Sequence, residues 1–167
     1  MRSQLQKKKL QLKTDPDQLR VAVVGIGSEL NGDDAAGIEI ARKINLASAL
    51  PADFIAINGG PIPENASGPL RKFAPDLVIM VDAADLGKAP GSIEWLEEEK
   101  IDGMSASSHT LPLSVLGNYL QSDLGCQVMY LGIQPEQLDF AAALSEKVQI
   151  AVEEIVTLFT EEFNLET

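Results

Sequence analysis

Two acidic side chains stand next to each other a short distance after an apolar run. Residues 21–26 are apolar apart from one glycine, and Asp33 and Asp34 follow within eight residues. One carboxylate of such a pair commonly caps the backbone N–H groups at the start of a helix. The other carboxylate has no such local role and could attract a cation. The sequence therefore predicts a helix cap, a cation ligand, or both at this position.

Asp82 directly follows residues 77–81, the most apolar run of the chain. A charge at the end of a buried strand is costly unless it is paired or coordinates a ligand. The alternative role is capping of the following turn, which Asp85 could share. Open α/β sheets bind ligands at the carboxyl ends of their strands, so Asp34 and Asp82 should meet at one edge if the sheet is parallel.

His109 is the only histidine, and it lies in a polar Ser-Ser-His-Thr segment. A lone histidine in a loop is usually solvated, and a single histidine rules out a two-histidine zinc peptidase site. The chain has no Gly-x-Ser-x-Gly sequence, and its single cysteine, Cys126, begins a predicted buried strand with no base beside it. Cys126 is therefore predicted to be a core thiol. A hydrolase with this sequence must use carboxylates, a metal, or both.

The glycines after the first apolar run raise the possibility of a nucleotide-binding loop. Leu30 stands where a dinucleotide-binding turn needs its third glycine. Asp33 stands where a phosphate-binding loop has its lysine, and two carboxylates would repel a triphosphate. We expect no nucleotide cofactor.

The elements that must position these residues alternate between short β-branched runs and longer segments of helical period. This pattern predicts an α/β fold, a single three-layer sandwich with a twisted, mostly parallel central sheet of about five strands and helices on both faces. Strands are expected at 21–26, 54–57, 77–81 (central), 92–96 (edge) and 128–133. Helices are expected at 33–49, 111–124 and from 145 onward.

The composition narrows the choice of partners and compartment. The 167 residues include 13 Lys and Arg against 25 Asp and Glu, a formal net charge of −12, and six of the cations fall in the first 20 residues. An acidic body repels a phosphate backbone, so we expect no nucleic-acid partner. No apolar run approaches the roughly 20 residues that span a bilayer, and none is typical of a secretory signal. We expect a cytoplasmic protein without membrane insertion.

The domain boundary is expected near residue 19. Residues 1–18 are rich in Lys and Gln and lack a periodic apolar face, which is typical of a flexible basic tail dispensable for folding. Residues 19–167 are expected to form a single α/β domain.

Five sequence blocks, in their order and spacing, resemble the nickel-iron hydrogenase maturation proteases. They are Gly25–Asp34, Gly59–Asn65, Val81–Gly91, His109–Leu113 and Gly132–Pro135. The last two blocks are most similar to the branch that acts on hydrogenase-3-type or F420-reducing enzymes.

This resemblance implies an aspartic-type endopeptidase that removes the C-terminal extension of the hydrogenase large-subunit precursor after nickel insertion. It implies that Asp34, Asp82 and His109 contact the metal and that Asp34 and Asp82 are catalytic. The nickel would belong to the precursor, which is the implied partner. Two carboxylates and one imidazole form a small, open site that suits such a borderline divalent metal.

Two other functions stay open from the residues alone. One is a metal-dependent hydrolase of small molecules, and the other is a nickel-binding chaperone without enzymatic activity. The sequence also leaves open whether a metal polarises the scissile carbonyl or a carboxylate activates water. The oligomeric state is not predicted.

Overall fold

The computed structural model describes residues 1–12, 19–46, 50–104 and 111–165. Five strands form one sheet in the order β2-β1-β3-β5-β4. The strands are β1 (Val21–Ile26), β2 (Phe54–Gly60), β3 (Leu77–Ala83), β4 (Ile93–Leu96) and β5 (Gln127–Ile133). All neighbouring pairs are parallel except β4 and β5. The predicted central strand and the predicted edge strand are both confirmed.

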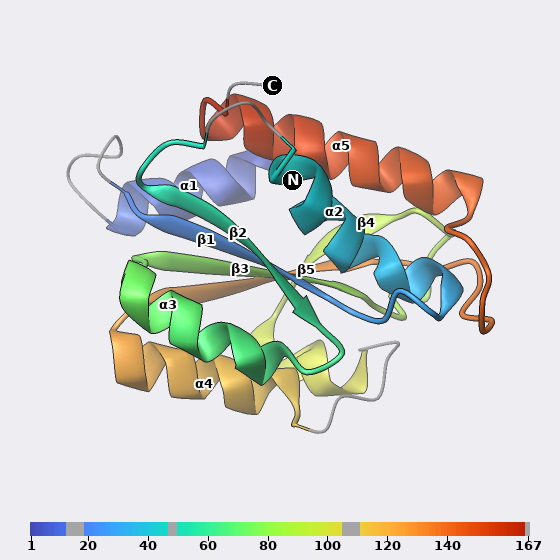
Figure 1. The fold of residues 1–167 in the computed structure, drawn as a ribbon, viewed down its shortest axis with the longest axis horizontal. Helices are drawn as coiled ribbons and strands as arrows, with labels where there is room; N and C mark the ends of the chain where they lie inside the picture. The colour runs from blue at the N-terminus through green and yellow to red at the C-terminus, as the bar shows by residue number, and fades with distance from the viewer. Residues whose placement is uncertain (13–18, 47–49, 105–110, 166–167) are drawn as a thin grey trace.

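Helices cover both faces of the sheet (Figure 1). On one face lie α1 (Arg2–Leu12), α2 (Ala36–Ile44) and α5 (Glu146–Glu162), and on the other lie α3 (Ser67–Phe73) and α4 (Leu113–Leu124). Each face has its own cluster of buried apolar side chains. The structure therefore confirms the predicted α/β sandwich with a mostly parallel five-stranded sheet.

The central strand β3 contributes to both clusters. All seven of its residues are buried. Ile79 and Val81 belong to the cluster beneath α2 and α5, whereas Val78 and Met80 belong to the cluster beneath α3 and α4. Because side chains alternate along a strand, Asp82 points to the same face as Met80.

Several boundaries differ from the sequence expectation. A 3₁₀ turn, η2 (Gly32–Ala35), precedes α2, so the helix expected from residue 33 begins at Ala36. Pro112 lies just before α4 instead of in its first turn. Two further 3₁₀ turns, η3 (Pro63–Ala66) and η4 (Glu98–Gly103), were not predicted. Helix α3 was also missed, because it has only seven residues and buries only Leu70.

The N-terminal segment differs from the expected flexible tail. Residues 2–12 form α1, and Leu5 is fully buried in the same cluster as Phe159 of α5. The Lys9 ammonium donates to the carbonyl oxygen of Glu162 at 2.8 Å, and Arg2 pairs with the Glu162 carboxylate at 3.1 Å. The basic segment is ordered because it meets the acidic C-terminal end of α5, where cations are favourable.

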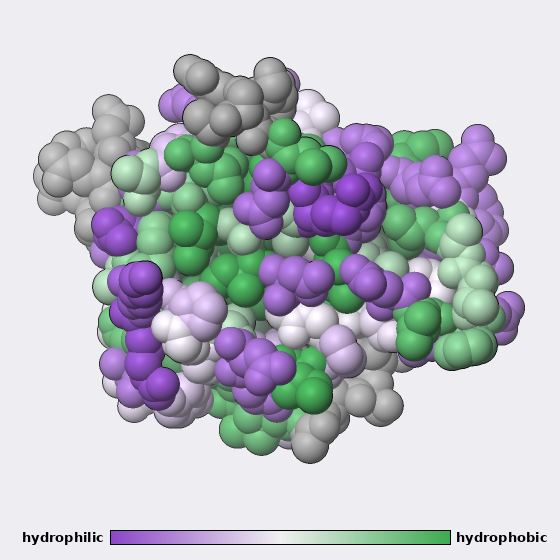
Figure 2. Space-filling model, viewed as in Figure 1, coloured by the Kyte–Doolittle hydropathy of each residue, from purple (hydrophilic) through white to green (hydrophobic). Residues whose placement is uncertain are grey.

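The surface mixes polar and apolar residues. Figure 2 shows hydrophobic areas interrupted by hydrophilic ones on the side that faces the viewer. Among the described residues, no helix combines the length and the apolar character needed to cross a membrane.

Candidate active site at the carboxyl ends of β1 and β3

Glycines bring Asp34 to the ends of two neighbouring strands. Gly27 follows β1 with φ +131°, and a Cβ there would lie 1.7 Å from the carbonyl oxygen of Asp34. A Cβ on Gly37 of α2 would lie 2.2 Å from the carbonyl oxygen of Val81 in β3. The absence of these side chains lets η2 and α2 pack directly against β1 and β3. Asp34 is only 2% exposed as a result.

Asp82 lies at the same end of the adjacent strand. Gly25 of β1 pairs with Val81 of β3 in parallel register, so Asp82 sits one residue beyond the last pair. It is 5% exposed and faces a small pocket whose other lining residues are apolar or aromatic, including Ile101, Leu113 and Tyr130. The structure therefore places Asp34 and Asp82 at the carboxyl edge of two neighbouring parallel strands, where the sequence predicted them.

His109 lies in residues 105–110, outside the described residues, so the structure does not place it. The described residues on either side of this segment contact the loop that follows Asp82 and line the pocket that Asp82 faces. The Met104 carbonyl oxygen accepts a hydrogen bond from the backbone N–H of Asp85 at 2.6 Å. On the other side, the Leu113 carbonyl accepts one from the Tyr130 hydroxyl at 3.3 Å. Within the described residues alone, no three or more His, Cys, Asp or Glu side chains are grouped to hold a metal ion.

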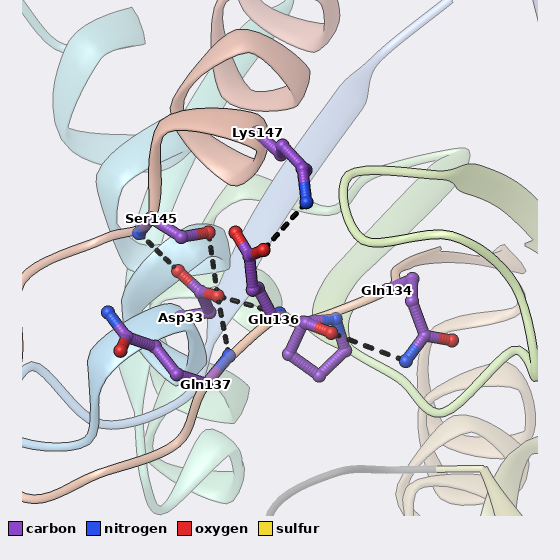
Figure 3. Close-up of polar contacts among 7 residues, drawn as sticks. Asp33, Gln134, Glu136, Gln137, Ser145 and Lys147 are labelled. Atoms are coloured by element: carbon purple, nitrogen blue, oxygen red, sulfur yellow. Dashed lines mark hydrogen bonds and ion pairs between the residues drawn. The ribbon is translucent and has the colours of Figure 1, made fainter.

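Asp33 has a role other than the predicted helix cap. The residue at the N-cap of α2 is Ala35, whose methyl side chain cannot cap the helix. The Asp33 carboxylate is fully buried and points to the segment that follows β5 (Figure 3). Its Oδ1 accepts a hydrogen bond from the backbone N–H of Ser145 at 2.6 Å, immediately before α5. Asp33 therefore supplies an anion to the N-terminus of α5, a favourable place for negative charge, instead of to its own helix.

A model of the HycI type of hydrogenase maturation protease matches residues 38–162. The chain belongs to this family. Hydrogenase 3 maturation protease of Escherichia coli K12 is 34% identical over 131 residues, which cover 78% of this chain and 82% of the relative. The crystal structure of HycI from Thermococcus kodakarensis superposes with a TM-score of 0.78 at 30% identity, covering 87% of this chain and 92% of that one.

Further structures of hydrogenase maturation proteases share the fold. The solution structure of the endopeptidase HycI from E. coli has a TM-score of 0.74 at 31% identity, and the match covers 83% of this chain and 88% of that chain. HybD from E. coli has a TM-score of 0.67 at 24% identity, which shows the common fold alone. As a hydrogenase maturation protease, this protein is a hydrolase of the endopeptidase class.

The single cysteine of this maturation protease is a core residue, as predicted. Cys126 is 2% exposed, and its Sγ lies 3.6 Å from the carbonyl oxygen of Leu120. Burial raises the pKa of the Cys126 thiol. Because the thiolate is the nucleophilic form, this environment disfavours catalysis by Cys126.

The sequence did not reveal the tertiary contacts of Asp33, Gln134 and Ser145. The adjacent Asp pair was a signal that one carboxylate has a structural role, but the partner helix was predicted incorrectly. Gln134 appeared only as part of a block that resembles the family. Asp33 and Ser145 are 112 residues apart in the chain, which local patterns cannot bridge.

Proposed function

We propose that this protein cleaves the C-terminal extension from the large-subunit precursor of a nickel-iron hydrogenase, after nickel has been inserted into that precursor. The observation that carries the proposal is the pair Asp34 and Asp82, which are 2% and 5% exposed at the carboxyl ends of neighbouring parallel strands. Buried carboxylates at this edge of an α/β sheet are typical of a ligand or catalytic site. Family membership supplies the class of substrate.

We further propose that His109 joins Asp34 and Asp82 in contacting the nickel of the precursor. The support is the position of the described residues on both sides of the His109 segment. Met104 is bonded to Asp85, three residues beyond Asp82, and Leu113 lines the same pocket as Asp82. Carboxylate and imidazole ligands suit a borderline divalent ion, and three of them leave positions for the substrate's own ligands.

The proposed reaction is of the aspartic type. One carboxylate of the pair Asp34 and Asp82 takes a proton from a water molecule, whose oxygen attacks the scissile carbonyl carbon of the precursor. The peptide C–N bond then breaks, and the proton passes to the leaving amine. In this scheme the nickel in the precursor is part of the substrate, and contact with it aligns the scissile bond. The reduced core thiol of Cys126 is compatible with action in the cytoplasm.

A cleavage assay tests this proposal. The purified protein is mixed with precursor that either contains or lacks nickel, and the shortened large subunit is followed by mass spectrometry. We expect cleavage of the nickel-containing form only. Equal cleavage of both forms would contradict recognition of nickel, whereas nickel binding without any cleavage would favour a chaperone. Hydrolysis of small esters or amides with no precursor cleavage would favour a small-molecule hydrolase.

The Asp34→Asn variant separates catalysis from folding. It keeps nearly the same side-chain shape and removes the charge, so we expect lost cleavage with an unchanged circular dichroism spectrum. His109→Ala tests the proposed ligand separately: nickel affinity of the free protein should fall. In the unmodified protein, nickel binding should also weaken as the pH falls through the range in which free imidazole takes up a proton. Unaltered nickel affinity in His109→Ala would remove that residue from the site.

A further inference from the structure

The hydrogen bonds that the Asp33 carboxylate makes with described residues all come from one segment, residues 134–145, which connects β5 to α5. Its Oδ2 accepts hydrogen bonds from the backbone N–H groups of Glu136 at 2.8 Å and Gln137 at 3.0 Å, and from the Ser145 hydroxyl at 2.9 Å. Its Oδ1 accepts the bond from the Ser145 backbone already described. Figure 3 shows these contacts converging on the carboxylate from both ends of the segment. Because the acceptor is a charged carboxylate, these hydrogen bonds are stronger than those between neutral groups.

The start of the same segment is bonded to the loop that follows Asp82. The Gln134 side-chain Oε1 accepts hydrogen bonds from the backbone N–H groups of Leu86 at 2.7 Å and Lys88 at 3.3 Å. The Gln134 backbone N–H donates to the carbonyl oxygen of Ser92 at 2.9 Å. Residues 134–145 are therefore bonded to the turn that carries Asp34 and to the loop that leaves Asp82.

The turn that carries Asp34 has little room to move. The Asp33 backbone N–H donates to the carbonyl oxygen of Gln137 at 3.0 Å. Gly32, at φ +54°, approaches the same carbonyl so closely that a Cβ would lie 2.9 Å from its oxygen. On the other side of the turn, Gly27 lies against the backbone of Asp34. The turn is enclosed between β1 and residues 134–145.

We propose that Asp33 is a positioning residue for the cleavage reaction. Its carboxylate fixes η2 against residues 134–145 and thereby holds the Asp34 carboxylate in place relative to Asp82. Gln134 completes the connection on the Asp82 side. This role rests on the proposed function, in which Asp34 and Asp82 act together.

The Asp33→Asn variant is the sharpest probe. Both carboxylate oxygens accept backbone N–H groups, so either orientation of an asparagine amide turns its NH₂ group toward an N–H donor. We expect the folded variant to lose about 10- to 100-fold in kcat for nickel-containing precursor and a similar factor in nickel affinity of the free protein, as for other residues that orient a metal-contacting side chain. Isothermal titration with nickel ions measures the affinity independently of cleavage.

A milder variant, Ser145→Ala, tests the same role if Asp33→Asn does not fold. Ser145→Ala removes only the hydroxyl bond and leaves the three backbone N–H bonds to Asp33, so we expect a loss of about two- to tenfold in both quantities. Gln134→Ala should also lower kcat. In the double variant with Ser145→Ala, the fold-loss in kcat should be smaller than the product of the two single losses, because both substitutions weaken the attachment of residues 134–145.

Asp76→Asn provides the control for lost stability. Asp76 is bonded to the backbone at the opposite end of β1 and β3, so its variant should lower the melting temperature without changing kcat or nickel affinity of the folded protein. If Asp33→Asn and Ser145→Ala behave as this control does, the positioning role is overturned while the proposed function stands. If the unmodified protein neither binds nickel nor cleaves precursor, the proposed function falls and the positioning role falls with it.

Discussion

The two ends of the parallel strands β1 and β3 use acidic side chains differently. At the amino end, the Asp76 carboxylate accepts a hydrogen bond from the backbone N–H of Arg20 at 2.8 Å, and the Asp76 carbonyl accepts one from Gln127 at 2.8 Å. The Arg20 guanidinium in turn donates to the Phe73 carbonyl at 3.0 Å and lies 4.4 Å from the Phe73 ring. These contacts join the starts of β1, β3 and β5 to the end of α3.

At the carboxyl end, three aspartates are buried. Asp33 is 0%, Asp34 2% and Asp82 5% exposed. Asp33 connects elements, as Asp76 does, but Asp34 and Asp82 form the candidate active site. Buried carboxylates at the carboxyl ends of parallel strands are typical of ligand and catalytic sites in open α/β sheets. The amino end therefore stabilises the sheet, whereas the carboxyl end holds the buried carboxylates of the candidate active site.

The largest effect is expected from Asp82→Asn at the carboxyl end. Removing the charge should lower the rate of precursor cleavage by about 10²- to 10⁴-fold, because Asp82 is one of the two carboxylates proposed to act on the attacking water. Asp85→Asn is the matched control, because Asp85 is exposed in the segment that follows β3. The hydrogen bond described for its carboxylate is the one that it accepts from the backbone N–H of Gly87. Cleavage by Asp82→Asn at the unmodified rate would remove Asp82 from the catalytic site.

A large effect on stability, not on cleavage, is expected from Leu5→Ala in α1, near the amino ends of the strands. Leu5 is fully buried, so its truncation should lower the free energy of unfolding by about 2–4 kcal/mol, measured by urea denaturation. Leu10→Ala, in the same helix but 70% exposed, should change it by no more than about 0.5 kcal/mol. Cleavage by the folded variants should be normal. Equal stability of the two variants would show that α1 does not pack on the domain in solution.

A smaller loss of stability is expected from Asp76→Ala. The backbone N–H of Arg20 loses its carboxylate acceptor at the start of β1, so the free energy of unfolding should fall by about 1–3 kcal/mol. Asp123→Ala is the comparison, because it breaks the exposed ion pair with Arg71 at 2.8 Å and should cost less than about 1 kcal/mol. Urea denaturation measures both. A drop in cleavage by folded Asp76→Ala would contradict the division between the two ends.

The smallest effect on cleavage is expected from modification of Cys126, at the amino end of β5. Because burial raises the pKa of this thiol, less thiolate is present at pH 8 than in an exposed cysteine. Iodoacetamide should therefore label the native protein much more slowly than the urea-unfolded protein, as measured by mass spectrometry. Native protein exposed to the reagent should keep its full cleavage rate. Rapid labelling with loss of cleavage would place the thiol in the active site.

Much of the fold and part of the candidate site follow from local sequence. The apolar run 77–81 predicts a strand buried on both faces, and the polar residue that ends it must emerge at the strand's carboxyl edge. Asp34 lies eight residues after β1, and its predicted place at the same edge came from the preference of open α/β sheets for ligands at the carboxyl ends of their strands. These predictions succeed because strand burial and strand ends depend on neighbouring residues and on a sheet geometry common to parallel α/β folds.

Other features depended on contacts between distant parts of the chain. Local periodicity gave no reason for residues 2–12 to form a helix, yet Leu5 and Lys9 find partners on α5, more than 140 residues away. The Asp33 carboxylate could have capped its own helix, and only the position of residues 134–145 shows that it bonds there instead. The strands and the acidic edge could be predicted from local pattern alone. Which side chain holds which element became visible only in the folded chain, because hydrogen-bond partners and burial are set by segments that meet only after folding.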